Sequence, residues 1–116
     1  MENSEKVAIY QLHAEFCKTL ADANRLLIIN ELGKEELPVN ELVRRLELHQ
    51  SNVSKHLALM RERGLVMTRR VGSTIYYSLV DKRISEAIKL LKEVQADQIE
   101  KQRVLARGIP EYSASK

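Results

Sequence analysis

Apolar residues recur along this chain with two different periods, and the change of period separates predicted helices from one predicted hairpin. Between residues 6 and 20 they form two interleaved stripes, each at helical spacing. The stripes are Val7, Tyr10, Ala14 and Cys17, and Ile9, Leu12, Phe16 and Leu20. A second helix is predicted over residues 22–31, because Asp22 can cap its start and Gly33 can end it.

Two short helices with apolar inner faces are predicted next. The third helix covers residues 38–46, since proline suits the first turn of a helix. The fourth begins at His49 or Gln50 and ends at Arg63-Gly64. Their inward positions are Val39, Leu42, Val43 and Leu46, and Val53, Leu57, Leu59 and Met60. The turn between them, Glu47-Leu48-His49, is short enough to make a helix-turn-helix.

The pattern then changes to the composition of strands. Residues 65–70 and 74–79 are rich in β-branched and aromatic side chains and flank Val71-Gly72-Ser73, so they predict a β-hairpin. A long helix follows from about residue 82 to Arg103. We therefore expect a domain over residues 1–105 and a flexible C-terminal tail over residues 106–116.

The order of these elements predicts a mainly α fold with a β-hairpin wing, a winged helix-turn-helix. The first and last helices carry more apolar surface than a domain of this size can cover by itself. We therefore expect a homodimer that packs through its first and last helices.

Composition and charge agree with a DNA-binding domain. The 116 residues leave room for one compact domain, and the hydrophobic share of 44% is that of a globular protein. The net charge is only +3, but residues 44–76 hold seven basic and two acidic residues, a local charge of +5. The basic ones are Arg44, Arg45, Lys55, Arg61, Arg63, Arg69 and Arg70. Such segregation is expected of a protein that neutralises phosphates.

Polar side chains gather on the opening turns of the fourth helix. They are Gln50, Ser51, Asn52, Ser54, Lys55 and His56. The amide of Gln50 or Asn52 can bond the edge of an adenine, and each such pair discriminates by about 1–3 kcal/mol. Lys55, Arg61 and the hydroxyl groups suit phosphate contacts. Ser and Asn also favour helix starts for structural reasons, but the charge and the wing beside them favour DNA; for His56, structural and DNA-contact roles stay open.

The hairpin supplies the remaining candidates for DNA contact, which are Arg69, Arg70, Ser73 and Thr74. Charged residues on an edge strand can also serve only to prevent pairing with other chains. A wing beside a recognition helix favours contact with phosphates or with an adjacent minor groove.

The sequence gives only weak indications of thiol chemistry, metal binding or catalysis. Cys17 shares an apolar stripe, so we expect a buried, inert thiol; the alternative is that two Cys17 residues meet near the dimer axis and respond to oxidants. His13 and His49 have no ligand-spaced partner. No nucleophile–base arrangement suggests an enzyme. A single cysteine and the absence of an apolar run long enough to span a bilayer predict a cytoplasmic protein.

Four blocks of sequence resemble the ArsR/SmtB family of bacterial and archaeal repressors. They are residues 16–26, 50–57, 59–66 and 72–79, in that order, and the resemblance extends over about residues 12–95. It implies a dimeric winged helix-turn-helix repressor that occupies an inverted-repeat operator in double-stranded DNA. It also implies release by a small inducer, often a metal ion.

The metal sites of the resembling family are not carried by this chain. Where metal-sensing members have Cys-x-Cys at the third helix, Pro38 and Asn40 stand instead. The family's second site, at the last helix, corresponds to Asp81, Lys82, Arg83, Val94 and Asp97, without its histidines. We therefore expect no metal and no cofactor, and an inducer that is an unidentified small molecule or an oxidant.

Three alternatives remain open from the sequence. The chain could be a regulator of this type that senses no metal and acts by occupancy or through a protein partner. It could be a winged-helix module that docks on an acidic protein surface. It could also be an architectural protein that binds DNA without sequence preference.

Overall fold

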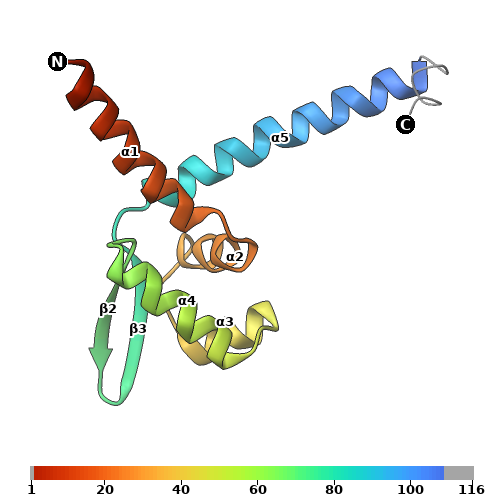
Figure 1. Ribbon diagram of the computed structural model, residues 1–116. Coiled ribbons are helices and arrows are strands. Elements are labelled where there is room, and N and C mark those ends of the chain that lie inside the picture. The colour runs from red at the N-terminus through yellow and green to blue at the C-terminus, as the bar shows by residue number, and fades with distance from the viewer. Residues whose placement is uncertain (1, 109–116) are drawn as a thin grey trace. The chain divides into compact units, whose positions relative to one another are not determined.

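The computed structural model describes residues 2–108 and divides them among five helices and three strands (Figure 1). The elements are α1 (Asn3–Leu20), α2 (Ala23–Leu32), β1 (Leu37–Pro38), α3 (Val39–Leu46), α4 (Gln50–Glu62), β2 (Val66–Val71), β3 (Thr74–Leu79) and α5 (Arg83–Gly108). This order confirms the predicted winged helix-turn-helix.

Local signals explain where the helices begin and end. The Asp22 carboxylate accepts hydrogen bonds from the backbone N–H groups of Asn24, at 2.9 Å, and Arg25, at 3.1 Å, so it caps α2 as predicted. Pro38 occupies the N-cap of α3. Glu47 adopts a left-handed conformation, with φ of 54°, and thereby turns the chain from α3 toward α4.

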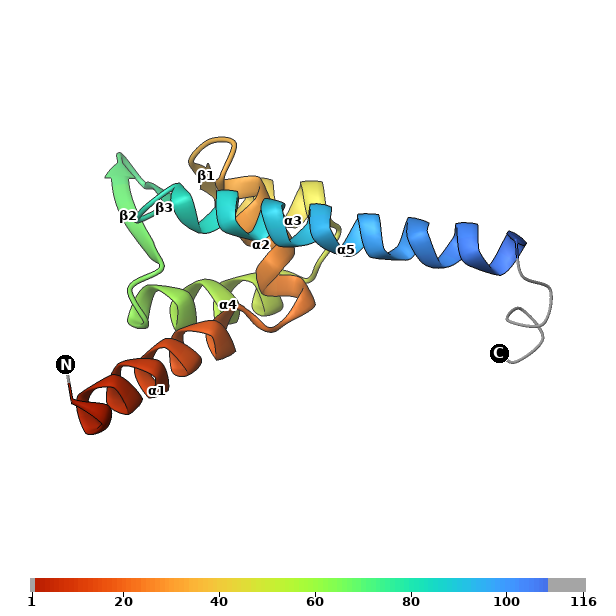
Figure 2. The same cartoon turned by 90° about the horizontal axis from the view of Figure 1, so that it is seen from above.

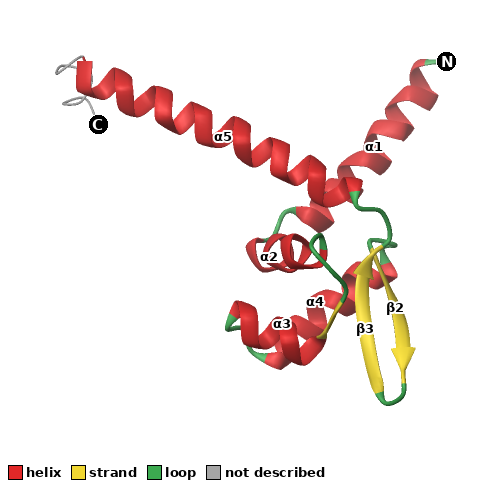
Figure 3. Cartoon of the chain, turned by 180° about the vertical axis from the view of Figure 1, so that it is seen from behind, coloured by secondary structure: helices red, strands yellow, loops and turns green. Residues whose placement is uncertain are grey.

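The sheet has three antiparallel strands in the order β1-β3-β2. Figure 3 shows β2 and β3 side by side as the hairpin. Val66 lies opposite Leu79 and Val71 opposite Thr74, so the loop is the two-residue turn Gly72-Ser73. Gly72 has φ of +62°, which this kind of tight turn requires. Val71, which we placed in the loop, belongs to β2, and the two-residue strand β1 was not predicted.

The core lies inside the helix-turn-helix and its wing, where α2, α3, α4 and the sheet pack together (Figure 2). Its buried apolar residues are Ile28, Ile29, Leu32, Leu37, Leu42, Val53, Leu57, Met60, Leu65, Val66 and Leu79. Three of the four inward positions predicted for α4 are buried, while Leu59 is half-buried. This part of the protomer therefore completes its own core.

The first and last helices lack such burial. Thr19 is the buried residue of α1, and no described residue of α5 is buried. Contacts within the chain separate one compact unit, up to Ser85, from a second that begins at Glu86 and contains the rest of α5. The helix continues to Gly108, so residues 106–108, which we assigned to a tail, are helical. The rest of the predicted tail, 109–116, lies outside the described residues.

Candidate DNA interface

One side of α4 carries an exposed polar row. Gln50, Ser51, Ser54 and Lys55 are all exposed, as predicted. Residues 50 and 54, and residues 51 and 55, are one helical turn apart and share a face. His49 occupies the N-cap without a side-chain capping bond, so the N–H groups of the first turn stay available to an acceptor such as a phosphate oxygen.

The opposite side of α4 carries a polar row that bonds within the protomer. The Asn24 side chain donates from Nδ2 to Asn52 Oδ1 at 3.3 Å, and Arg25 donates from Nη1 to His56 Nδ1 at 3.2 Å. His56 is only 9% exposed. Of the two roles left open for His56, this geometry favours the internal one, and a DNA contact by His56 stays a prediction.

Asn52 differs from Gln50 in the same way. Its side chain is half-buried and its amide oxygen already accepts from Asn24. A bidentate bond to adenine needs both the oxygen and the nitrogen of the amide. Gln50, which is exposed, is therefore the better candidate for contact with a base edge.

The two wing arginines point to opposite faces of the hairpin. Because side chains alternate along a strand, Arg70 shares the face of buried Val66, and Arg69 lies on the other face. The Arg69 Nε donates to Glu36 Oε2 at 3.2 Å, its Nη2 pairs with Glu36 Oε1, and its guanidinium lies 5.4 Å from the centre of the Tyr76 ring.

Arg69 is thus engaged within the protomer, whereas Arg70 is exposed and has no ion pair within residues 2–108. The Arg69 guanidinium holds the pKa of the Glu36 carboxyl below its usual range, and Glu36 raises the pKa of Arg69. Sequence reasoning treated the two arginines alike. The structure favours Arg70 as the phosphate contact and Arg69 as the anchor of the wing.

The tip of the wing and the start of α4 border one hollow. It measures about 330 Å³ and is lined by Pro38, Val39, Asn40, Gln50, Ser73, Thr74, Ile75 and Tyr77. The structure therefore brings Ser73 and Thr74 close to Gln50, as a shared interface requires. Asn40 was not among our DNA candidates. The structure shows Asn40 exposed in the first turn of α3. The sequence could have indicated it by its amide side chain near the start of the predicted third helix.

Fewer basic side chains are free to contact phosphates than the sequence suggested, because several pair with acidic residues. Arg44 donates to Glu41 at 3.1 Å, and Arg45 pairs with Glu41 at 3.0 Å and with Glu35 at 3.1 Å. These arginines lower the pKa of Glu41 to about 2. The acidic partners precede residue 44, so the local charge of +5 did not count them. Lys55, Arg61 and Arg70 remain exposed and unpaired within the described chain.

Cys17 is exposed on α1, so the prediction of a buried thiol is wrong for the protomer. Its Sγ lies 3.6 Å from Nε2 of His13. Whether two Cys17 residues meet in a dimer stays a prediction.

No group of three or more His, Cys, Asp or Glu side chains is placed to hold a metal within residues 2–108. Asp81, at a family metal position, accepts a hydrogen bond from Arg83 Nη2 at 2.7 Å, and this pairing lowers the pKa of Asp81 to about 2.

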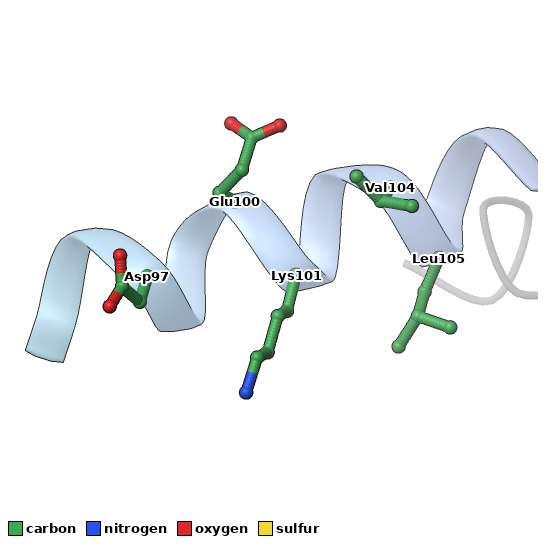
Figure 4. Close-up of a pocket in the computed structure, with 5 residues that line it drawn as sticks. All are labelled: Asp97, Glu100, Lys101, Val104 and Leu105. Atoms are coloured by element: carbon green, nitrogen blue, oxygen red, sulfur yellow. The ribbon is translucent and has the colours of Figure 1, made fainter.

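A hollow of about 550 Å³ along α5 is lined by Asp97, Glu100, Lys101, Val104 and Leu105 (Figure 4). Its described lining comes from one helix, so we assign it no site. None of the helices in this range is long and apolar enough to cross a membrane.

Comparison with known proteins places these features among transcriptional regulators. Residues 22–68 match the family model described as "Bacterial regulatory protein, arsR family". The transcriptional repressor PagR of Bacillus anthracis is 45% identical over 84 residues, which cover 71% of this chain and 83% of PagR. The transcriptional activator HlyU of Vibrio cholerae is 43% identical over 83 residues, covering 70% of this chain and 77% of HlyU.

A solved structure extends the likeness to the fold. The homodimeric winged helix-turn-helix DNA-binding domain of a Mycobacterium bovis protein superposes with a TM-score of 0.74 and 25% identity. The match covers 85% of this chain and 92% of that domain. The match therefore covers more of the chain than the helix-turn-helix and wing alone.

Proposed function

Because this chain belongs to the ArsR family of bacterial regulatory proteins, we propose that it regulates transcription as a homodimer bound to an inverted-repeat operator. The observation that carries the proposal is the exposed polar row of α4, Gln50, Ser51, Ser54 and Lys55. A helix in this position of a winged helix-turn-helix enters the major groove with its N-terminal residues against the base edges. Arg70, Ser73 and Thr74 then contact the backbone beside it.

The apolar surface that the protomer leaves uncovered supports the proposed dimer. Leu12 on α1 and Leu91 on α5 are 72% and 69% exposed, and each lies on a helix with further exposed apolar residues. The Mycobacterium bovis relative is homodimeric. A two-fold dimer of residues 1–105 presents two α4 helices to half-sites one helical turn of DNA apart, or a multiple of it.

We propose that the protein represses transcription in the cytoplasm by occupying a promoter, and that it is not an enzyme. PagR is a repressor and HlyU is an activator, so the sign is a separate question from DNA binding. Release would follow from a small molecule or an oxidant that lowers operator affinity by about 1–3 kcal/mol, the usual size of allosteric coupling.

The test is a selection of bound sequences from random double-stranded DNA, followed by salt titrations of the selected duplex and a scrambled duplex. We expect a preferred inverted repeat and an affinity that falls linearly with salt on logarithmic axes. Equal affinity for both duplexes would instead indicate an architectural protein. Failure to bind either duplex would indicate a protein-interaction module.

A further inference from the structure

The recognition helix is held against α2 by polar contacts as well as by apolar packing. Asn24 bonds to Asn52 at 3.3 Å, and Arg25 bonds to His56 at 3.2 Å. Asn52 and His56 are one turn apart on α4, and they alternate along the sequence with the exposed Ser51 and Lys55. A rotation of α4 about its axis would therefore break both bonds and turn the exposed row away from its present direction.

Arg25 connects three helices. While Nη1 donates to His56 on α4, its Nε donates to the backbone carbonyl of Thr19 in the last turn of α1. Thr19 is 5% exposed, and its hydroxyl donates to the carbonyl of Glu15 at 3.4 Å. The planar guanidinium can make both bonds at once with fixed geometry, which a lysine ammonium on its flexible stem cannot do equally well.

The hydrogen bonds of the His56 ring are set by these neighbours. Because Nδ1 accepts from Arg25, the ring proton of the neutral imidazole lies on Nε2, which faces the Asp22 carboxylate at 3.8 Å. Asp22 is in turn fixed by the backbone N–H groups that it caps. The buried imidazole thus has one defined orientation, with the guanidinium on one side and the carboxylate on the other.

We propose that Arg25 is a positioning residue for sequence recognition: through His56 it sets the rotation of α4, and through Thr19 it makes that rotation depend on α1. This inference rests on the proposed function, since it assigns to α1, a helix of the proposed dimer contact, a connection to the exposed row of α4. A change in the dimer contact at α1 would then reach the DNA contacts without any ligand touching α4.

The test compares the affinity of the full-length dimer for the selected duplex with its affinity for a scrambled duplex. Arg25→Met keeps most of the stem and removes the guanidinium. We expect the ratio of the two affinities to fall about tenfold, the cost of one misplaced base contact, with affinity for scrambled DNA nearly unchanged. Arg25→Lys should recover only part of the ratio. The matched control is Arg103→Met, at an exposed arginine that pairs with Glu100 on α5, and its ratio should equal that of the unmodified protein.

A second pair of variants tests the same contact from α4 and does not depend on the folding of the Arg25 variants. His56→Asn keeps an acceptor near the position of Nδ1, whereas His56→Leu removes it at similar size. We expect His56→Asn to keep most of the selectivity and His56→Leu to match Arg25→Met. Equal selectivity in the two His56 variants, or an equal loss of affinity for both duplexes, would overturn the inference.

A measurement without DNA separates this inference from the proposed function. In the free dimer, backbone amide chemical shifts of residues 50–57 should move in Arg25→Met and stay in place in Arg103→Met. Unmoved shifts would overturn the positioning role even if the unmodified protein prefers its operator. If the shifts move while the unmodified protein shows no sequence preference, the positioning of α4 stands and the proposed function fails.

Discussion

The helix-turn-helix with its wing and the two flanking helices solve the burial of apolar side chains differently. Leu42 and Leu57 are completely buried within the protomer, whereas Leu12 on α1 and Leu91 on α5 stay largely exposed. Apolar content is not what distinguishes the helices of the two regions, because all of them carry apolar residues at helical spacing. We call the helix-turn-helix and its wing, residues 23–79, the DNA-reading part. The contrast indicates that the DNA-reading part has its own core, while α1 and α5 present apolar surface for contact with a second copy of the chain.

The largest expected effect is a loss of core packing in the DNA-reading part. Leu57→Ala should lower the free energy of unfolding by about 2–5 kcal/mol, because it removes a fully buried side chain and leaves a cavity. Denaturant unfolding followed by circular dichroism measures it. Leu12→Ala should instead act through the dimer, with a loss that depends on protein concentration. A loss at Leu12 that is as large as at Leu57 and independent of concentration would contradict this contrast.

A charge on the exposed stripe of α5 should separate the protomers. We expect Leu91→Asp to raise the dissociation constant of the dimer about thirtyfold or more, since the proposed contact would bury an unpaired carboxylate. Sedimentation equilibrium measures the constant, and the helical content should be unchanged. Lys89→Asp places the same side chain at an exposed polar position and is the control. An unaltered dimer in Leu91→Asp would remove α5 from the interface.

Within the DNA-reading part, the two wing arginines should have different effects. Arg70→Gln should weaken binding to all duplexes by severalfold and reduce the salt slope by about one for each phosphate that the arginine neutralises. Arg69→Gln should instead resemble Glu36→Gln, because both variants release the same anchor of the wing. Salt titrations of the three variants measure this. The assignment is wrong if Arg69→Gln alone reduces the slope.

The smallest expected effect concerns the paired arginines of α3. The Glu41 pKa of about 2 lies below its ordinary value of 4.5, so the stabilisation from Arg44 and Arg45 is present above pH 4.5 and is lost as the pH falls toward 2. A carboxyl titration by nuclear magnetic resonance measures the midpoint. In the Arg44→Gln/Arg45→Gln variant it should return toward the ordinary value. A midpoint near 4.5 in the unmodified protein would free both arginines for DNA.

Features that depend on neighbouring residues were predictable from the sequence. The cap at Asp22 needs only the N–H groups two and three residues ahead, and the hairpin needs a glycine between two β-branched segments. The exposed row of α4 was among the polar residues that the sequence placed at the start of the fourth helix, but the structure was needed to separate it from Asn52 and His56.

Features that depend on distant partners were not predictable. Strand β1 has two residues and one is a proline, so it exists only through its pairing with Tyr76 and Tyr77. Arg69 and Arg70 look equivalent until Glu36 and the strand register separate them. The internal hydrogen bond of His56 comes from Arg25, 31 residues away in the sequence. Cys17 was expected to be buried because it shares an apolar stripe of α1, but that stripe is exposed in the protomer.

Backbone amide chemical shifts of the dimer, recorded as the selected duplex is added, provide the sharpest test of this division between a DNA-reading part and dimer-forming helices. They report both parts in one experiment. We expect the largest perturbations on residues 50–55 of α4 and 70–74 of the wing, with little change along the exposed stripes of α1 and α5. Perturbations concentrated on α1 or α5, with α4 unaffected, would show that the division is wrong.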